Sequence, residues 1–216
     1  MTMSDTIDPG PAGETAKAAR VDGRRLRSER TRRLIIEAYM ALVRETGQMP
    51  TAVQIAERAG YSVRSVFERF PDLTTLRIAV TDYAIAEARA NAALRDLDAD
   101  RLTRIRSQVE QRGRGCERWL PLWRVLSSDS ERSPDLNQRI RMIRQLIVMR
   151  MEMMFRPELS SVSDDVRRKI MLALESLLDF ESWARMRELY GLSFDQASGV
   201  WVKAIDRLLP ATPAAA

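Results

Sequence analysis

Residues 51–70 read TAVQIAERAGYSVRSVFERF. Thr51 is placed to cap a first helix, and Gln54, three positions later, completes a capping box. Gly60 ends that helix, because glycine tolerates the left-handed conformation that a tight turn needs. Ser62 then caps a second helix. Two short helices joined by a sharp turn are the layout of a helix-turn-helix unit, and this stretch predicts one.

The two helices are expected over 52–59 and 63–70. An apolar stripe at helical spacing predicts the buried side of the second: Val63, Val66, Phe67 and Phe70. The opposite side is polar: Arg64, Ser65, Glu68 and Arg69. Two packed helices with no role in nucleic-acid binding would show the same local pattern, so the flanking residues are needed to choose between these interpretations.

The segment upstream is strongly basic. Residues 20–33, RVDGRRLRSERTRR, hold seven arginines against Asp22 and Glu29, a local excess of five positive charges. The whole chain has a formal net charge of +5, so the remaining residues sum to zero. A positive patch beside a two-helix motif favours binding to a polyanion, because neutralised phosphates release condensed counterions. The alternative is a solvated basic face without a partner.

Helices are also expected on both sides of the motif. One precedes it over about 24–46 and ends at Gly47. Another follows over about 73–94 with Asp72 as its cap. The expected buried side of the first is Leu34, Ile35, Ala38, Leu42 and Val43.

Residues 24–80 resemble the DNA-binding domain of TetR-family transcriptional regulators. The resemblance lies in the arginine-rich start, the run LIIEAYMALVRETG, a threonine-capped IAERAGYSVRSVF, and then ERF-P-D-L-T-T-L. Leu76 matches a leucine of the family pattern, and Phe67 matches an aromatic. Phe67 stands where the family usually has a tyrosine whose hydroxyl reaches a phosphate, and Leu73 stands where it often has a lysine.

This resemblance implies a sequence-specific transcriptional regulator, a ligand-responsive repressor that binds a palindromic double-stranded DNA operator as a homodimer. Its helix 63–70 would enter the major groove, where arginine can pair with guanine and glutamate can accept from cytosine. The residues expected at the DNA are Arg24, Arg25, Arg27, Thr51, Ser62, Arg64, Ser65, Phe67, Glu68 and Arg69. The alternative is an all-α interaction or scaffold protein whose basic segment binds an acidic partner.

The C-terminal half also predicts helices. One starts at Asp98 or Asp100 and is expected to end near Gly113 or Gly115, and a short one follows around WLPLWRVL. Ser133-Pro134 starts a helix that is expected to stop before residue 157. The remaining expected elements are a long helix over 164–190 capped by Ser163, and a last helix whose capping box is formed by Ser193 and Gln196.

Residues 180–209 resemble the end of TetR-like regulators, in which the last two long helices pair with those of a second subunit. That resemblance predicts Trp201 at a subunit interface. It also implies a pocket for a small-molecule effector of unknown identity, because methionine and aromatic side chains form adaptable apolar walls. The candidates are Trp119, Trp123, Met142, Leu146, Met149, Met153, Phe155, Phe180 and Trp183, each of which could instead be an ordinary core residue.

The chain as a whole is expected to be all-α. It divides into a disordered arm (1–20), a three-helix helix-turn-helix DNA-binding domain (21–76), a helical ligand-binding and dimerisation domain (77–210) and a frayed tail (211–216). Pro and Gly punctuate the polar arm, and alternating β-branched runs are scarce.

Several function classes are disfavoured. The chain has no histidine and one cysteine, Cys116, so no enzymatic activity, metal site or cofactor is expected. No apolar run reaches the ~18 residues of a membrane span, and no secretion leader is evident. A cytoplasmic location without a membrane partner is therefore predicted.

Overall fold

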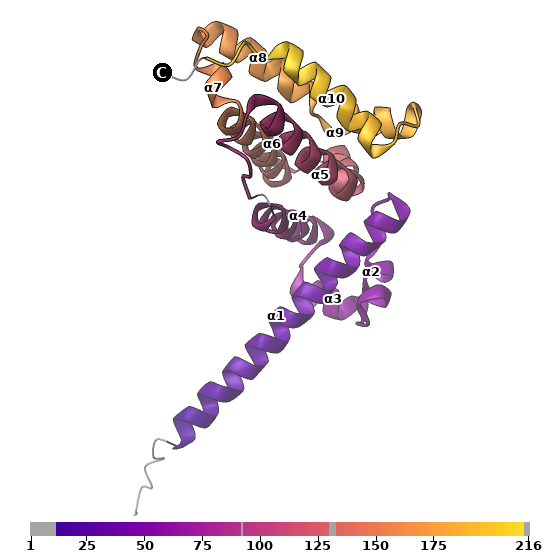
Figure 1. Ribbon diagram of the computed structural model, residues 1–216. Coiled ribbons are helices and arrows are strands. Elements are labelled where there is room, and N and C mark those ends of the chain that lie inside the picture. The colour runs from indigo at the N-terminus through magenta and orange to yellow at the C-terminus, as the bar shows by residue number, and fades with distance from the viewer. Residues whose placement is uncertain (1–11, 92, 130–132, 214–216) are drawn as a thin grey trace, which may run out of the picture.

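The computed structural model describes residues 12–91, 93–129 and 133–213, and it describes their side chains except at residues 12–24 and 129. Within these ranges every regular element is a helix, and no strand occurs (Figure 1). The prediction of an all-α fold is therefore confirmed for the described part of the chain. The first residues of the predicted arm and the last residues of the predicted tail lie outside it.

Helix α1 (Ala12–Thr46) is longer than predicted. It begins within the segment expected to be a loose arm, and it passes through Gly23 without a break. Ala, Glu, Lys and Arg are good helix formers, and an internal glycine costs only about 1 kcal/mol relative to alanine. The C-terminal part of α1 lies beside α2 and α3, whereas its N-terminal part extends away from the other helices (Figure 1).

Helices α2 (Ala52–Ala59), α3 (Val63–Arg69) and α4 (Leu73–Ala90) follow the sequence signals closely. Both halves of the Thr51 capping box are present, and Gly60 has the left-handed φ of 74° that ends α2. Helix α4 ends a turn before the predicted residue 94. The predicted domain boundary falls inside α4, which packs on α1 and α6 and joins the N-terminal helices to the rest (Figure 1).

Helix α5 (Arg101–Asp129) corrects the prediction of two shorter helices, because it runs through Gly113, Gly115 and Pro121. Tertiary contacts outweigh these local breakers. A Cβ added at Gly113 would lie 2.7 Å from Cη2 of Trp183, so the glycine allows a close approach between α5 and α9. In this position the glycine serves packing and does not end the helix.

The last third of the chain contains shorter and more numerous helices than predicted. The expected helix over 164–190 ends at Leu177, and Asp179 caps a new helix by accepting a hydrogen bond from the backbone N–H of Glu181. Ser163 stands at the start of α8 without a side-chain capping hydrogen bond. The elements are α6 (Pro134–Met154), α7 (Arg156–Leu159), α8 (Asp164–Leu177), α9 (Phe180–Ala184), the π-helical turn η2 (Arg185–Leu189) and α10 (Phe194–Leu208).

The C-terminal helices form a core around two tryptophans. Trp183 packs on Trp201 with ring centroids 4.7 Å apart, and both side chains are almost fully buried. The prediction that Trp201 lies at a subunit interface is therefore wrong, because α10 turns this residue inward against α9 and α5. The stability of the protomer itself depends on this contact.

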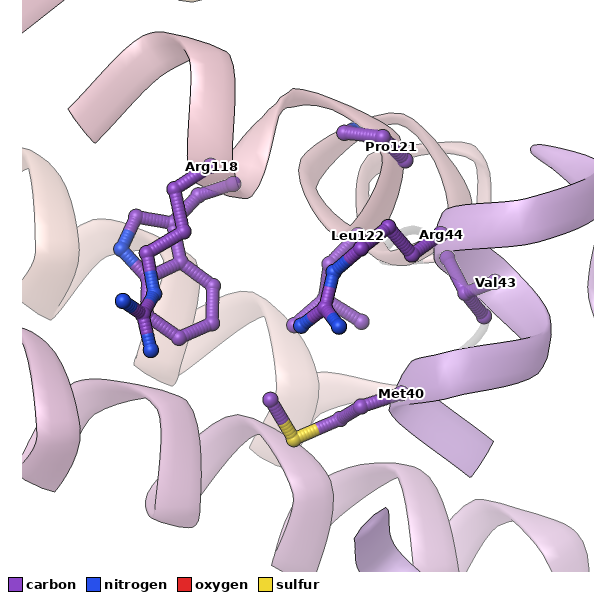
Figure 2. Close-up of a pocket in the computed structure, with 7 residues that line it drawn as sticks. Met40, Val43, Arg44, Arg118, Pro121 and Leu122 are labelled. Carbon is purple, nitrogen blue, oxygen red and sulfur yellow. The ribbon is translucent and has the colours of Figure 1, made fainter. Parts of the chain in front are cut away.

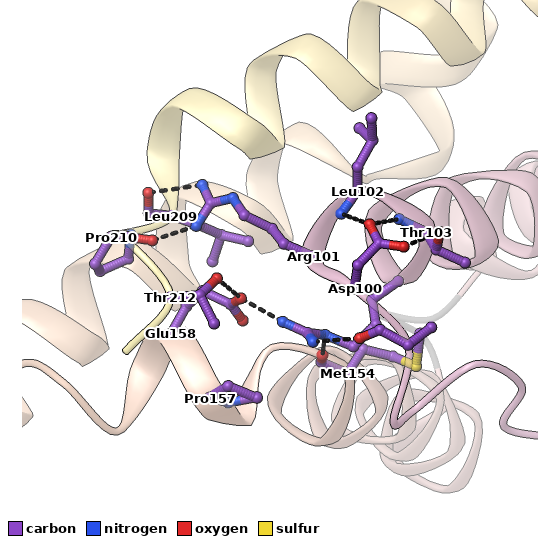
Figure 3. Close-up of polar contacts among 12 residues, drawn as sticks. Asp100, Arg101, Leu102, Thr103, Met154, Pro157, Glu158, Leu209, Pro210 and Thr212 are labelled. Carbon is purple, nitrogen blue, oxygen red and sulfur yellow. Dashed lines mark hydrogen bonds and ion pairs between the residues drawn. The ribbon is translucent and has the colours of Figure 1, made fainter. Parts of the chain in front are cut away.

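Arginines of α5 fasten the C-terminal end of the chain. Arg101 binds the Asp206 carboxylate at 2.9 Å and the Leu209 carbonyl at 3.1 Å. Arg104 pairs with the buried carboxylate of Glu158, which also accepts a hydrogen bond from Thr212 at 2.6 Å (Figure 3). These contacts tie α5, α7 and the segment after α10 together.

Candidate nucleic-acid interface

The solvent-facing side of α3 carries most of the side chains predicted to meet DNA. The Arg64 side chain is 89% exposed, and its Nε lies 3.1 Å from Oε1 of Glu68. Ser62 is exposed, and its Oγ accepts the backbone N–H of Ser65 at 3.1 Å. Because an exposed ion pair of this kind is weak, Arg64 and Glu68 can exchange each other for polar groups of a partner.

Two side chains of α3 do not lie where the predicted stripes put them. Phe67 is predicted on the buried side but is 41% exposed, whereas Val66 and Phe70 are fully buried. Arg69 is predicted to face outward but is partly buried, and its Nε is buried without a hydrogen-bond partner among the described residues. At 100° per residue, both positions fall at the edges of the buried arc of this short helix.

Contacts from α1 fix the orientation of α3. Arg32 donates to the backbone carbonyl of Arg69 at 3.2 Å, and its guanidinium lies 4.3 Å from the ring centroid of Phe70. Thr31 donates to the hydroxyl of Tyr61 at 3.3 Å. From the sequence alone, Arg32 is one more member of the basic patch. Its contact with Phe70 becomes visible only once the helices are packed. Arg32 is therefore a positioning residue of the candidate interface.

Helix α2 is held at both ends. Thr51 caps it, with the Thr51 backbone N–H donating to Oε1 of Gln54 at 2.8 Å. Arg58 pairs with Glu45 of α1, and the hydrogen bond from Arg58 lowers the pKa of the Glu45 carboxyl. At the start of α4, the hydrogen bond from the Thr75 backbone N–H lowers the pKa of the capping carboxyl of Asp72 in the same way.

The arginines of α1 fall into two groups. Arg25 and Arg27, in the N-terminal half of α1, are exposed. Arg33 is tied to Glu37 one turn later, with Nε and Oε1 2.7 Å apart. The side chain of Arg24, a predicted phosphate contact, lies outside the described residues. The predicted basic patch thus contains exposed cations, of which Arg33 is ion-paired although 69% exposed, and the positioning residue Arg32.

The residues predicted to line an effector pocket do not converge on one site. Trp123 and Phe180 stack with centroids 4.7 Å apart and line a small pocket together with Arg112 and Arg144. The cavity volume there is about 10 Å³, room for about one water molecule. Trp119 belongs to a different pocket.

The other pocket candidates lie on surfaces or in the core. Met142, Met149 and Met153 are exposed at 37%, 54% and 40%, because they lie on the face of α6 that points away from the bundle. Leu146 is half-buried on the same helix. The fully or nearly fully buried ones are Phe155 and Trp183, and Trp183 also donates to Glu117.

Other chemistry finds little support in the described residues. They contain no group of Cys, Asp and Glu side chains arranged to hold a metal ion. Burial raises the pKa of the Cys116 thiol to about 11, which leaves almost no reactive thiolate at neutral pH. No helix in the described ranges has the length and apolarity needed to cross a membrane.

Comparisons with known proteins add no assignment. The chain matches no protein-family model, and no curated protein matches it.

Proposed function

We propose that this chain is a TetR-type, sequence-specific DNA-binding transcriptional regulator, a ligand-responsive repressor that binds a palindromic operator as a homodimer. The observation that carries the proposal is the outward face of α3, where Arg64 and Glu68 are exposed next to Ser62, Ser65 and the edge of Phe67. We assign the chain no enzymatic reaction and no cofactor.

Helix α3 would lie in the major groove. Its polar groups suit base edges, since arginine pairs with guanine and carboxylate accepts from cytosine, and Phe67 offers an apolar contact to a thymine methyl group. Arg32 of α1 binds the Arg69 carbonyl at the end of α3, and Thr31 of α1 binds Tyr61 in the turn before α3, so the side chains of α3 are presented by a fixed scaffold. Arg69 would contribute less than its sequence position suggests, because its Nε is buried.

Helix α1 would contact phosphates. Arg25 and Arg27 are exposed on its projecting part, and Thr51 lies exposed at the start of α2, where backbone N–H groups attract anions. These contacts carry no base information but contribute to affinity and to its salt dependence.

A second subunit would pack on α8 and α10, as the resemblance implies. Leu172 of α8 is 58% exposed, Val200 of α10 is 47% exposed, and the exposed Gly199 leaves open space for a neighbouring helix. We expect the double variant Leu172→Glu/Val200→Glu to sediment as a monomer. The control variant Leu102→Glu also replaces an exposed leucine, on α5, with a charge, and it should leave the dimer intact. If the double variant remained fully dimeric, the face formed by α8 and α10 would be excluded as the subunit interface. Half-sites about 34–36 Å apart, or somewhat more, suit such a dimer.

A gel-shift experiment with genomic fragments over a salt series tests the proposal. We expect a preferred sequence to be retained while affinity falls steeply with salt. Binding with no sequence preference at any salt concentration would favour the alternative, a protein whose basic segment binds an acidic partner. Absence of DNA binding would refute the proposal outright.

A further inference from the structure

The outer surface of the bundle offers a partner more than its pockets do. The pocket between α1 and α5, which Met40, Arg44 and Leu122 help to line, has a cavity volume of about 10 Å³, room for about one water molecule (Figure 2). The pocket at Trp123 and Phe180 is no larger. The outer face of α6, by contrast, leaves several large apolar side chains in solvent. This face is therefore the stronger candidate for a binding surface.

Four apolar side chains form a row along the outer face of α6, here called the methionine row: Met142, Leu146, Met149 and Met153. The three methionines are 37%, 54% and 40% exposed, and the leucine is half-buried. Steps of four, three and four residues keep the row within about 60° of the helix circumference, and such steps let one helix pack along another. Single exposed apolar residues are ordinary, but a contiguous row is typical of an interaction surface.

Most charged side chains of α6 serve the bundle, but two do not. Arg139 binds a carboxylate of α4, Arg144 lies 5.6 Å from the centroid of a tryptophan ring of α5, and Arg150 binds a glutamine amide of α5. Arg141 and Glu152 are exposed, and neither side chain has a partner among the described residues.

Arg141 and Glu152 lie on the same flank of the methionine row. Eleven residues separate them, so at 100° per residue they are within about 20° of each other around the helix. They are also about 16 Å apart along its axis, too far to pair within one chain. The row is therefore flanked by two opposite charges that only another molecule can satisfy.

A second copy of α6, running antiparallel, complements this face. With a two-fold axis between residues 147 and 148, Met142 of one copy lies opposite Met153 of the other, and Leu146 lies opposite Met149. On the shared flank, Arg141 of each copy then lies about 3 Å along the axis from Glu152 of the other copy. Both unpaired charges would gain an opposite partner, and the symmetry would form this ion pair twice.

We propose that the methionine row is a docking site for a second copy of this chain, with α6 packed antiparallel on α6 and Arg141 of each copy paired with Glu152 of the other. This contact is separate from the subunit face on α8 and α10, so it would join dimers into tetramers or longer arrays. One helix face buries less than the ~800 Å² per partner of a stable interface, so we expect weak association, with a dissociation constant on the order of 100 µM.

On DNA, this contact would act between dimers bound at neighbouring operators, and this part rests on the proposed function. Two dimers on one fragment have an effective concentration of about 1 mM, so a contact of that strength would tighten two-site binding roughly tenfold. Self-association itself does not depend on DNA.

Sedimentation equilibrium of the full chain from about 5 to about 500 µM tests the contact, a range that brackets the expected dissociation constant. The Leu172→Glu/Val200→Glu variant isolates it, and we expect monomers at the lowest concentrations and dimers at the highest. In this background Arg141→Glu should weaken association about tenfold or more, because the introduced carboxylate faces Glu152 of the other copy twice. Arg106→Glu, which changes an exposed arginine of α5, should have no effect.

The reciprocal variant Arg141→Glu/Glu152→Arg distinguishes docking of two copies from every other occupant. It restores both ion pairs with their signs exchanged, so association should recover to within about twofold of the starting variant. A folding defect or a different protein partner would not give this recovery. Met149→Glu, which puts a charge in the middle of the row, should abolish association.

Several results would overturn the proposal: no association at the highest concentration, an unchanged dissociation constant in Met149→Glu, or no recovery in the reciprocal variant. Binding to phosphatidylserine vesicles that Met149→Glu abolishes, without self-association, would assign the row to a membrane surface instead. In gel shifts with a two-site fragment, equal cooperativity in Met149→Glu and the unchanged chain would overturn the role on DNA. If no DNA fragment binds while the reciprocal variant restores association, the regulator proposal fails and the α6 contact stands.

Discussion

The two halves of this molecule use arginine differently. In the C-terminal bundle some arginine side chains are exposed, but six bind carboxylates, carbonyl oxygens, amides or aromatic rings of the same chain: Arg101, Arg104, Arg112, Arg124, Arg139 and Arg150. In the N-terminal helices, Arg25, Arg27 and Arg64 are exposed, and among the described side chains only Arg64 of these three has an ion-pair partner, the exposed Glu68.

The difference separates positive charge that stabilises the fold from charge that is available to a partner. A guanidinium held by buried or half-buried acceptors cannot leave them without leaving those acceptors unpaired. An exposed one loses little when it moves to a phosphate or a base. Net charge alone does not show this distinction, since Arg32 lies in the basic segment but is held by the Phe70 ring and the Arg69 carbonyl.

The largest expected effect is on Arg104. Arg104→Ala leaves the fully buried Glu158 without its cation, and the free energy of unfolding should fall by about 3–5 kcal/mol. Urea denaturation measures it, and the folded fraction should bind DNA as before. Arg114→Ala, which removes an exposed arginine from the same helix, should change stability by no more than about 0.5 kcal/mol. Similar losses in both variants would contradict the structural role of Arg104.

The second prediction compares two glycines of α5. Gly113→Ala places a methyl group against Trp183 and should destabilise the fold by about 1–3 kcal/mol. Gly115→Ala meets no atom within 4 Å and should stabilise the helix by up to about 1 kcal/mol. Thermal unfolding followed by circular dichroism gives both values. Stabilisation by both changes would mean that α5 and α9 pack less closely than described.

The third prediction concerns the outward face of α3. Arg64→Ala should weaken binding to the preferred DNA site by about 1–3 kcal/mol and relax base preference, with no loss of stability. Competition gel shifts against variant sites measure this. An equal loss on every sequence would assign Arg64 to a phosphate instead of a base.

The smallest effect is expected along α1. Arg25→Ala should lower the slope of log affinity against log salt by about one, because one phosphate contact is lost, with little change in sequence preference. Arg33→Ala, whose side chain is held by Glu37, should change the slope less. A larger change for Arg33 than for Arg25 would reverse the distinction between the two groups.

Local sequence signals predicted the helix ends well in and around the two-helix unit at 51–70. Thr51, Gly60, Ser62 and Asp72 each act at the predicted position, because a cap satisfies backbone groups within a few residues of itself. The expected breaks in α5 were wrong for the opposite reason. There, a local penalty of a few kcal/mol is outweighed by the packing of Trp183 and its neighbours on a long helix.

Burial at helix edges was the least predictable property of the candidate site. Phe67 was expected on the buried side but is 41% exposed, and Arg69 was expected to face outward but its Nε is buried. The same is true of the expected pocket, whose methionines lie on the outer face of α6.

The amino-acid sequence by itself determined the helical class, the capped two-helix unit at 51–70 and the concentration of arginine beside it, since these depend on hydrogen bonds and charges close together in the chain. Only the tertiary structure decided which arginines remain exposed and that Trp201 belongs to the core. Those features depend on contacts between residues distant in sequence, where burial and close packing override local preference.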